Sequence, residues 1–437
     1  MKPPLRACLL VAVTTALLAP QPADPTELLA KARALLVARA KRLPDYTCVQ
    51  TVDRQYFKHR HPQLPPLPCA QIAAFNKDNP HDLGLQSTDR VRLELKVSQG
   101  MEIGAWAGAS QFGARSVFDL IGGGAYGTGT LGTLLADIFE NGGATYKYMG
   151  EETARGLKLA AYGYRVPAGS SHYEVKTGSD WTATAFSGVF WIDLDSLDLR
   201  RLVVDANELP PESRGCEAET TVEYQKVPVG TGEFLLPLRS AMRMVMTDAT
   251  ETRTTAVYSG CREYHGEATI RFDDAAVAGE VQAAASPTVP LPGSLSLSLA
   301  LTSPIDTDTA AAGDIVTARL RKPVHIAKEV LVPAGATVEG RIVQMQHWLE
   351  KPRHFTISLL LEKLEVPGVA TPLFARPTWK DELAGIVLPP MWQSPLVAAF
   401  VFTTDKNRHI VPAGYQTNWV TVAPQQESAP QPPPAAP

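Results

Sequence analysis

Apolar residues recur with helical spacing in one stretch near the N-terminus and alternate with polar residues through much of the remaining chain. Within 24–41 they follow the positions i, i+4, i+7 and i+8, at Leu28, Ala32, Leu35 and Leu36. Asp24 and Pro25 stand ahead of this stripe, where they cap a helix and open its first turn, and Pro44 follows its end. The spacing predicts one amphipathic helix, which we expect to pack on a sheet rather than lie on a membrane.

Strict alternation begins in the segment RVRLELKVS at 90–98, with valine and leucine on one side and mostly charged residues on the other. A Gln-Gly turn and a returning strand follow, so the segment predicts a half-buried antiparallel hairpin. The segment GVFWIDLDSLDLRRLVV at 188–204 repeats this form around an Asp-Ser turn, and one short helix over 131–140 interrupts the strands. We therefore expect a mostly β protein with a few helices, whose first domain, 24–274, is an antiparallel half-barrel.

A second β domain is predicted after a linker. Residues 275–292 are rich in alanine, proline, serine and valine and sustain no period, which is typical of a linker. The segment SLSLSLAL at 294–301 then alternates strictly, so its leucines should point inward. We expect a small β-barrel or β-sandwich over 293–422 and a disordered, proline-rich tail over 423–437.

The tetrapeptide V-P-A-G occurs three times, at 166–169, 332–335 and 411–414. Apolar residues precede each copy, and alternating residues follow it. Proline presets φ for the second position of a turn, and glycine tolerates the positive φ that closes such turns. The repeat therefore predicts a strand–turn–strand joint rather than a functional motif.

The first 23 residues predict a signal peptide. Lys2 and Arg6 precede an apolar run of 13 residues at 7–19. This run is too short to cross a bilayer, which takes about 20 residues. We expect cleavage at a position that the sequence leaves open, a mature chain without a transmembrane span, and a periplasmic or secreted protein. The alternative is an uncleaved anchor.

Removing the signal peptide leaves four cysteines: Cys48, Cys69, Cys216 and Cys261. An even number of cysteines in an exported protein predicts disulfides rather than free thiols. Of the three connectivities, we favour the sequential pairs Cys48–Cys69 and Cys216–Cys261, each of which closes a short loop. No C-x-x-C spacing or nearby histidine cluster favours zinc.

Composition and motifs argue against most catalytic chemistries. The net charge of −4 gives no basic footprint for nucleic acid. The glycine-rich segment 121–132 contains G-x-G-x-x-G but lies outside any βαβ pattern, so we expect no nucleotide. Asp193, Asp195 and Asp198 could bind calcium or form an acid–base pair, but they surround a turn that favours aspartate. No G-x-S-x-G elbow is present, so we predict no catalytic residue, cofactor or metal.

Six aromatic residues gather in the middle of the first domain and are the candidate ligand-binding residues. A curved sheet with an inward aromatic face, closed by one or two helices, makes an apolar groove. Phe190 and Trp191 alternate across one strand, so only one of them can face such a groove. The alternative is an ordinary filled core. The candidate groove residues are Tyr162, Tyr164, Trp181, Phe186, Phe190 and Trp191.

Two resemblances to known families add to this interpretation. The predicted helix, Y-T-C at 46–48, GVFWIDLDSLDLRRL, VEYQKV and LLPLR together resemble the LolA/LolB-like periplasmic lipoprotein-carrier fold over about 24–274. That resemblance implies an incomplete antiparallel barrel that is covered by helices and holds acyl chains. AGDIVTARLRKPV and VPAGATVEGRI are similar to the TrbI-like β-barrel domain of type IV secretion components over about 288–422. This second resemblance implies a structural domain, with no catalytic residue.

The pattern as a whole predicts an exported, non-enzymatic protein of the cell envelope. We expect its half-barrel to bind a lipid or another apolar ligand. The first alternative is a structural or protein-interaction component with an envelope partner and no small-molecule ligand. The second is a hydrolase of unknown specificity.

Overall fold

The computed structural model describes residues 24–60, 67–98, 101–109, 112, 121, 129–177, 180–264, 291–366, 369–378 and 396–423. The predicted signal peptide, most of the predicted linker and nearly all of the predicted tail lie outside these residues. Strands dominate, and every pairing between two of the described strands is antiparallel, which confirms the mostly β fold class. The described α-helices are α1 (Pro25–Ala40), α2 (Cys69–Asp78) and α4 (Thr133–Phe139).

Ten strands of the first half form one antiparallel sheet in the order β3-β2-β1-β12-β11-β10-β9-β8-β5-β4. No pairing in the described chain joins its edge strands β3 and β4, so the half-barrel stays open. A small hairpin of β6 and β7 stands apart from it. The strands are β1 (Tyr46–His59), β2 (Leu83–Ser98), β3 (Met101–Trp106), β4 (Thr145–Ala154), β5 (Leu157–Val166), β6 (Glu174–Thr177), β7 (Asp180–Ala183), β8 (Phe186–Asp193), β9 (Leu199–Ala206), β10 (Gly215–Val229), β11 (Gly232–Met246) and β12 (Glu251–Glu263).

Seven strands of the second half follow the order β22-β19-β18-β15-β13-β24-β21. No hydrogen-bonded pairing closes this sheet within the described residues, so the expected barrel is not a closed one. The leucines of the SLSLSLAL segment that lie in β13 are buried, as predicted. The strands are β13 (Ser296–Leu301), β14 (Ile305–Asp306), β15 (Ile315–Leu320), β16 (Val324–Ile326), β17 (Glu329–Val332), β18 (Thr337–Trp348), β19 (His354–Val366), β20 (Val369–Pro372), β21 (Ala375–Pro377), β22 (Val397–Thr403), β23 (Ile410–Val411) and β24 (Gln416–Thr421).

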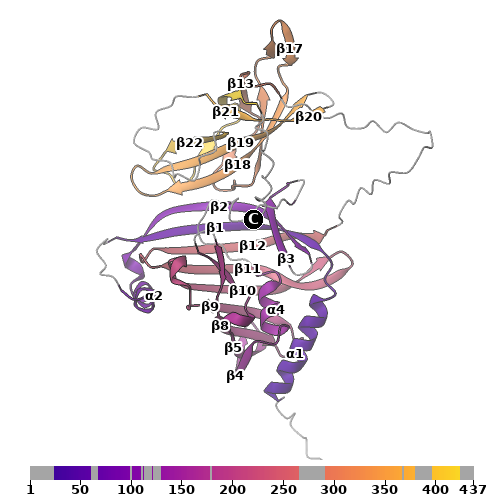
Figure 1. The fold of residues 1–437 in the computed structure, drawn as a ribbon, viewed down its shortest axis with the longest axis vertical. Coiled ribbons are helices and arrows are strands. Elements are labelled where there is room, and N and C mark those ends of the chain that lie inside the picture. The colour runs from indigo at the N-terminus through magenta and orange to yellow at the C-terminus, as the bar shows by residue number, and fades with distance from the viewer. Residues whose placement is uncertain are drawn as a thin grey trace, which may run out of the picture.

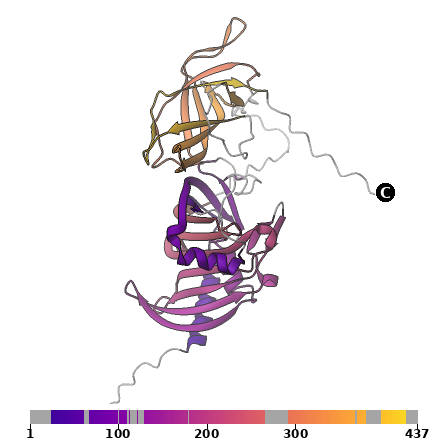
Figure 2. The ribbon, with the colours of Figure 1, turned by 90° about the vertical axis from the view of Figure 1, so that its left-hand side faces the viewer.

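The two halves stack along the long axis of the molecule and meet at strand β2 (Figures 1 and 2). One end of β2 pairs with β18, where His347 lies opposite Thr88. Farther along, the backbone N–H of Arg92 donates to the carbonyl of Ala312 (2.6 Å). The buried guanidinium of Arg341 donates to two carbonyls in this junction, at 2.7 and 2.8 Å. The sequence did not predict this direct pairing of the two sheets.

Helix α1 forms as its sequence predicts. The side chain of Asp24 caps it by accepting a hydrogen bond from the backbone N–H of Thr26 (3.0 Å). Leu28, Ala32 and Leu36 are buried against the first-half sheet, together with side chains of α4. These two helices cover one face of the sheet, and α2, which the sequence pattern did not predict, packs near β10 and β11.

The predicted disulfide pairing is wrong. Cys48 pairs with Cys261, and Cys69 pairs with Cys216, so both bonds join residues far apart in the sequence. β1 and β12 are neighbours in the sheet, which places Cys48 beside Cys261. Cys69 opens α2, which packs on β10, the strand that carries Cys216. Sheet topology, and not the length of the loop closed, therefore decides the connectivity.

All three V-P-A-G copies form turns, but in a different register from the one predicted. In each copy the proline carbonyl accepts a hydrogen bond from the N–H three residues later, so proline takes the first turn position rather than the second. Gly335 and Gly414 have φ values of 85° and 84°, as expected for the third position of such a turn. Gly169 has no positive φ, because its copy continues into a 3-10 turn at Ala168–Ser170.

Candidate functional site

The covered face of the first-half sheet holds four of the six predicted groove residues. Tyr162 and Tyr164 come from β5, and Phe186 and Phe190 come from the neighbouring strand β8. Tyr162 lies directly opposite Phe190 in the strand register. All four side chains are buried beneath α1 and α4 in one apolar cluster. The alternation of β5 and β8 therefore brings these four aromatic rings together, and the ligand groove that they were expected to line stays a prediction.

Phe190 is the centre of this aromatic cluster. Its ring centroid lies 5.0 Å from that of Phe139 on α4 and 5.5 Å from that of Tyr162, which stacks on it. The rings of Tyr164 and Tyr146 lie at 5.9 and 6.2 Å. Such tilted and edge-on arrangements are the favoured ones for aromatic pairs. The site is thus filled by its own side chains in this structure.

The other two predicted groove residues lie elsewhere. Trp181 belongs to β7, in the separate hairpin, and is 39% exposed. Trp191 follows Phe190 on β8 and points to the opposite face, where the guanidinium of Arg201 lies 4.7 Å from its ring centroid. The alternation of a strand explains why Phe190 and Trp191 separate, as expected, whereas Trp181 was wrongly grouped because nearness in sequence is not nearness in space.

The buried tyrosines act as hydrogen-bond donors. The hydroxyl of Tyr162 donates to the carbonyl of Pro25 at the start of α1 (2.8 Å), and that of Tyr164 donates to the carbonyl of Val203 (2.9 Å). Burial, together with the neighbouring Tyr148, raises the pKa of Tyr162 to about 12. Burial also holds the pKa of Tyr164 well above its ordinary value. Both hydroxyls therefore stay protonated near neutral pH, which suits packing and not acid–base chemistry.

Arg33 connects the two covering helices. Its guanidinium donates from Nη2 (3.0 Å) and Nε (3.3 Å) to the carbonyl of Phe139 at the end of α4. The same guanidinium lies over the ring of Tyr146, 5.0 Å from the centroid. A cation at a helix C-terminus satisfies a free carbonyl and complements the helix dipole. Arg33 therefore holds α1 against α4.

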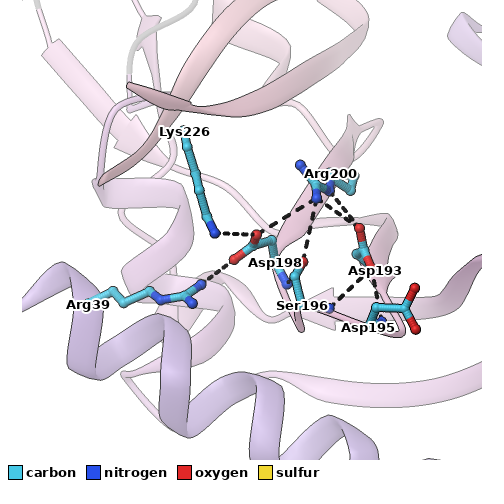
Figure 3. A network of polar contacts seen from close by, with 7 residues as sticks. All are labelled: Arg39, Asp193, Asp195, Ser196, Asp198, Arg200 and Lys226. Carbon is cyan, nitrogen blue, oxygen red and sulfur yellow. Dashed lines mark hydrogen bonds and ion pairs between the residues drawn. The ribbon is translucent and has the colours of Figure 1, made fainter. Parts of the chain in front are cut away.

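Arg39 fastens the last turn of α1 to the sheet through a buried carboxylate (Figure 3). It pairs with Asp198, which Lys226 Nζ (3.3 Å) and Arg200 Nη2 (3.8 Å) also approach. Burial by itself raises the pKa of Asp198, but hydrogen bonds from Ser196 and Arg39 outweigh it and place the pKa below its ordinary value. Asp198 therefore stays charged beneath the helix.

The neighbouring aspartates complete the same network. Asp193 accepts hydrogen bonds from the backbone N–H groups of Asp195 (2.9 Å) and Ser196 (3.2 Å) and from Arg200 (2.8 Å). Burial opposes these bonds, which nevertheless lower the pKa of Asp193. The aspartates considered for calcium thus shape a turn and bind the cations of the protein. Within the described ranges, no group of His, Cys, Asp or Glu side chains is arranged to hold a metal ion.

Two contacts of α1, and the lysine that shares one of them, could not be predicted from the sequence. Arg33 and Arg39 look like ordinary polar-face residues of an amphipathic helix, and Lys226 looks like a solvent-facing residue of a strand. Asp198 lies 159 residues from Arg39 in the chain. Only the aspartate-rich turn carried a signal, and it suggested a metal site rather than an attachment point for a helix.

Comparison with known proteins finds likenesses among solved structures. No protein-family model matches the chain, and no curated protein matches it. A Vibrio parahaemolyticus domain assigned as an outer membrane lipoprotein-sorting protein aligns with 55% of this chain and 93% of its own, at 11% identity and a TM-score of 0.27. A DUF1329 family protein from Desulfovibrio piger aligns with 56% and 95%, at 10% identity and a TM-score of 0.27. The lipoprotein LppX of Mycobacterium tuberculosis aligns with 56% and 99%, at 15% identity and a TM-score of 0.20.

These TM-scores are too low to carry the function of those proteins over to this chain. None of the three is described as a type IV secretion component, so the resemblance of the second half to that family stays a prediction. Among the described helices, none is both long and apolar enough to cross a membrane.

Proposed function

We propose that the first half carries a lipid or another apolar ligand on its aromatic face, and that α1 is the cover that moves to admit it. The observation that supports this is the attachment of α1. Only three side chains of the helix, Leu28, Ala32 and Leu36, are buried. Its polar contacts are those already described: the Pro25 carbonyl with Tyr162, Arg33 with Phe139, and Arg39 with Asp198.

Displacing this helix would uncover part of an apolar face lined by aromatic and aliphatic side chains, the rest of which lies under α4. Acyl chains and similar ligands bind such faces because burial of apolar surface drives their association. The raised pKa values of Tyr162 and Tyr164 keep these two hydroxyls protonated near neutral pH, so neither serves as a base there. We therefore propose a non-enzymatic role in an extracytoplasmic compartment, which the two disulfides support.

Native mass spectrometry of detergent-free protein purified from an exported fraction tests the proposal. We expect a discrete adduct of several hundred daltons that is lost on denaturation. The proposal would be contradicted if the protein showed only its polypeptide mass, both as purified and after incubation with phospholipid or fatty acid.

A matched pair of variants locates the ligand. Phe190→Leu changes the covered face, whereas Trp191→Leu makes the same change one residue away on the opposite face. Titration with the fluorescent apolar probe N-phenyl-1-naphthylamine should show weaker uptake for Phe190→Leu and unchanged uptake for Trp191→Leu. Equal probe uptake by both variants would show that the probe does not bind the face that carries Phe190.

The filled state of the aromatic cluster favours a second candidate, an envelope protein that binds a protein partner and no small molecule. Phe190 and Tyr162 are fully buried, so the cluster serves equally as a core. A bare mass together with no probe uptake would favour this candidate over the carrier.

A further inference from the structure

A small hairpin projects from the second half, at the end of the molecule far from α1 (Figure 1). It consists of β16 and β17, which form a two-stranded sheet of their own. At its base, Val324 and Val332 are buried in the core of the second half. The hairpin is therefore anchored at its base, while its tip extends beyond the core.

Apolar side chains at the tip of this hairpin are exposed. Val330 is 55% exposed, Ile326 42% and Leu331 39%. Ile326 lies opposite Glu329, and Val330 lies opposite His325. Successive pairs in a hairpin point to opposite faces, so Ile326 and Val330 lie on opposite faces of this one. Leu331 occupies the irregular position between the paired residues. A surface that covered one face alone would leave part of this apolar tip in water.

The same segment is basic although the protein as a whole is acidic. Residues 321–332 contain three basic residues, Arg321, Lys322 and Lys328, and one acidic residue, Glu329. The whole chain, by contrast, has a net charge of −4. Lys322 and Lys328 are exposed and form no ion pair within the described part of the chain. Their charges are therefore free to meet an anionic surface.

We propose that this hairpin docks the protein on an anionic phospholipid surface. Apolar side chains on both faces of the tip would enter the headgroup–acyl boundary, which surrounds an inserted segment on all sides. Lys328, in the turn of the hairpin, would reach the headgroups, and Lys322, just before the base, would add attraction to anionic lipid from farther out. Long lysine stems reach such a position while their ammonium groups stay in water.

An acidic protein groove is the competing partner, and the geometry favours lipid over it. A groove would have to enclose both faces of the tip, whereas a membrane does so without a matched shape. The proposal stands apart from the proposed carrier function, because the hairpin lies in the other half of the molecule and shares no residue with the aromatic face.

Vesicle co-sedimentation tests this docking surface. The full chain should bind vesicles of phosphatidylglycerol and phosphatidylcholine, bind pure phosphatidylcholine much less, and lose binding at high salt. Lys322→Glu/Lys328→Glu and Val330→Ser/Leu331→Ser should each lower partitioning by about tenfold or more. Val257→Ser is the matched control, since Val257 is 51% exposed on β12 and lies outside the hairpin.

A labelled residue reports whether the tip enters the lipid. Leu331→Cys carrying the dye NBD should brighten on anionic vesicles, whereas Val257→Cys carrying the same dye should not. Absence of binding to anionic vesicles at low salt would overturn the proposal and direct attention to an acidic protein partner. Unchanged partitioning of both double variants, with circular dichroism showing folded protein, would also overturn it. Native mass spectra of the hairpin variants test the carrier function separately, because an adduct there does not depend on the hairpin.

Discussion

The sheet of the first half needs helices to cover its apolar face, whereas the sheet of the second half buries its own. Side chains of α1 and α4 pack on the apolar face of the first-half sheet. In the second half, Ala375 on one edge strand and Ala398 on the other belong to the same core, and no α-helix is described there. A cover can move without breaking the sheet beneath it, whereas a core shared by both edges of a sheet opens only when the sheet opens.

The two halves also differ in how they are fastened. Both disulfides lie in the first half, together with the charged network under α1. These links tie β1 to β12, α2 to β10 and α1 to the turn at Asp198. The apolar face of the sheet is still kept from water by the helices that pack on it. The proposed ligand exchange thus concerns the first half, and the proposed docking hairpin belongs to the second.

The largest difference between the halves should follow from removing a disulfide. Cys48→Ala/Cys261→Ala opens a loop of 213 residues and should cost about 3–5 kcal/mol of unfolding free energy. Hydrogen exchange should rise in β1 and β12 more than in β18 and β19. Equal increases in both halves would show that they unfold as one unit, through the pairing of β2 with β18.

An apolar ligand should stabilise a cavity variant of the second half more than a cavity variant of the first half. Phe190→Ala and Phe400→Ala each remove a buried ring and should each cost about 3–5 kcal/mol. Dodecanoic acid at about a hundred times its wild-type Kd should add about 2.7 kcal/mol to the unfolding free energy of Phe400→Ala, because the proposed site in the first half stays intact. It should add less to Phe190→Ala, which lacks the central ring of that site. Thermal unfolding with and without the acid measures both effects, and stabilisation of neither variant would contradict the proposed site.

Weakening the attachment of α1 should have a moderate effect. Arg39→Ala removes one of three cations at Asp198 and should cost about 1–2 kcal/mol, because the carboxylate keeps Lys226 and Arg200. It should also speed the uptake of the apolar probe. Lys31→Ala, which breaks only an exposed pair with Glu27 on the same helix, should cost less than about 0.5 kcal/mol and leave uptake unchanged. Identical uptake rates would argue against α1 as the moving cover.

Alanine at the glycine of each V-P-A-G turn should lower the free energy of unfolding more in the second half than in the first. Gly335→Ala and Gly414→Ala place a side chain at positive φ and should each cost about 1 kcal/mol. Gly169→Ala, in the first-half copy, should change the free energy of unfolding by less than about 0.5 kcal/mol, because its φ is not positive. Chemical denaturation of the three variants checks this order.

The smallest expected effect is a different response to acid. Burial, with the charges of Arg353 and His354, lowers the pKa of His347 in the second half. Its neutral form is favoured in the folded state, so stability falls as the pH drops from about 6.5 towards the lower folded pKa. Asp193 and Asp198 have lowered pKa values, so the stability they add to the first half is present above about pH 4 and is lost as the pH falls further.

Hydrogen exchange at pH 7.5 and 5.5 should therefore show loosening near His347 before the attachment of α1 weakens. His347→Gln should remove the first change. Loosening of α1 ahead of β18 would contradict this order.

Local patterns in the chain predicted much of the fold. The capped stripe of α1, the alternation of β8 and the inward leucines of β13 each depend on neighbours a few residues away, and all three were confirmed. The same alternation separated Phe190 from Trp191 and so indicated the covered face. Such features are determined by the sequence because the period of a helix or strand assigns each side chain to one face.

Contacts between distant segments were decided by the tertiary structure alone. The disulfide partners, the pairing of β2 with β18 and the attachment of Arg39 to Asp198 join residues that no local pattern relates. The first two depend on which strands become neighbours in the sheet, and the third depends on where α1 packs. Each prediction from sequence distance failed or was never made. The physical reason is that hydrogen-bonded pairing of strands, rather than loop length, brings these side chains together.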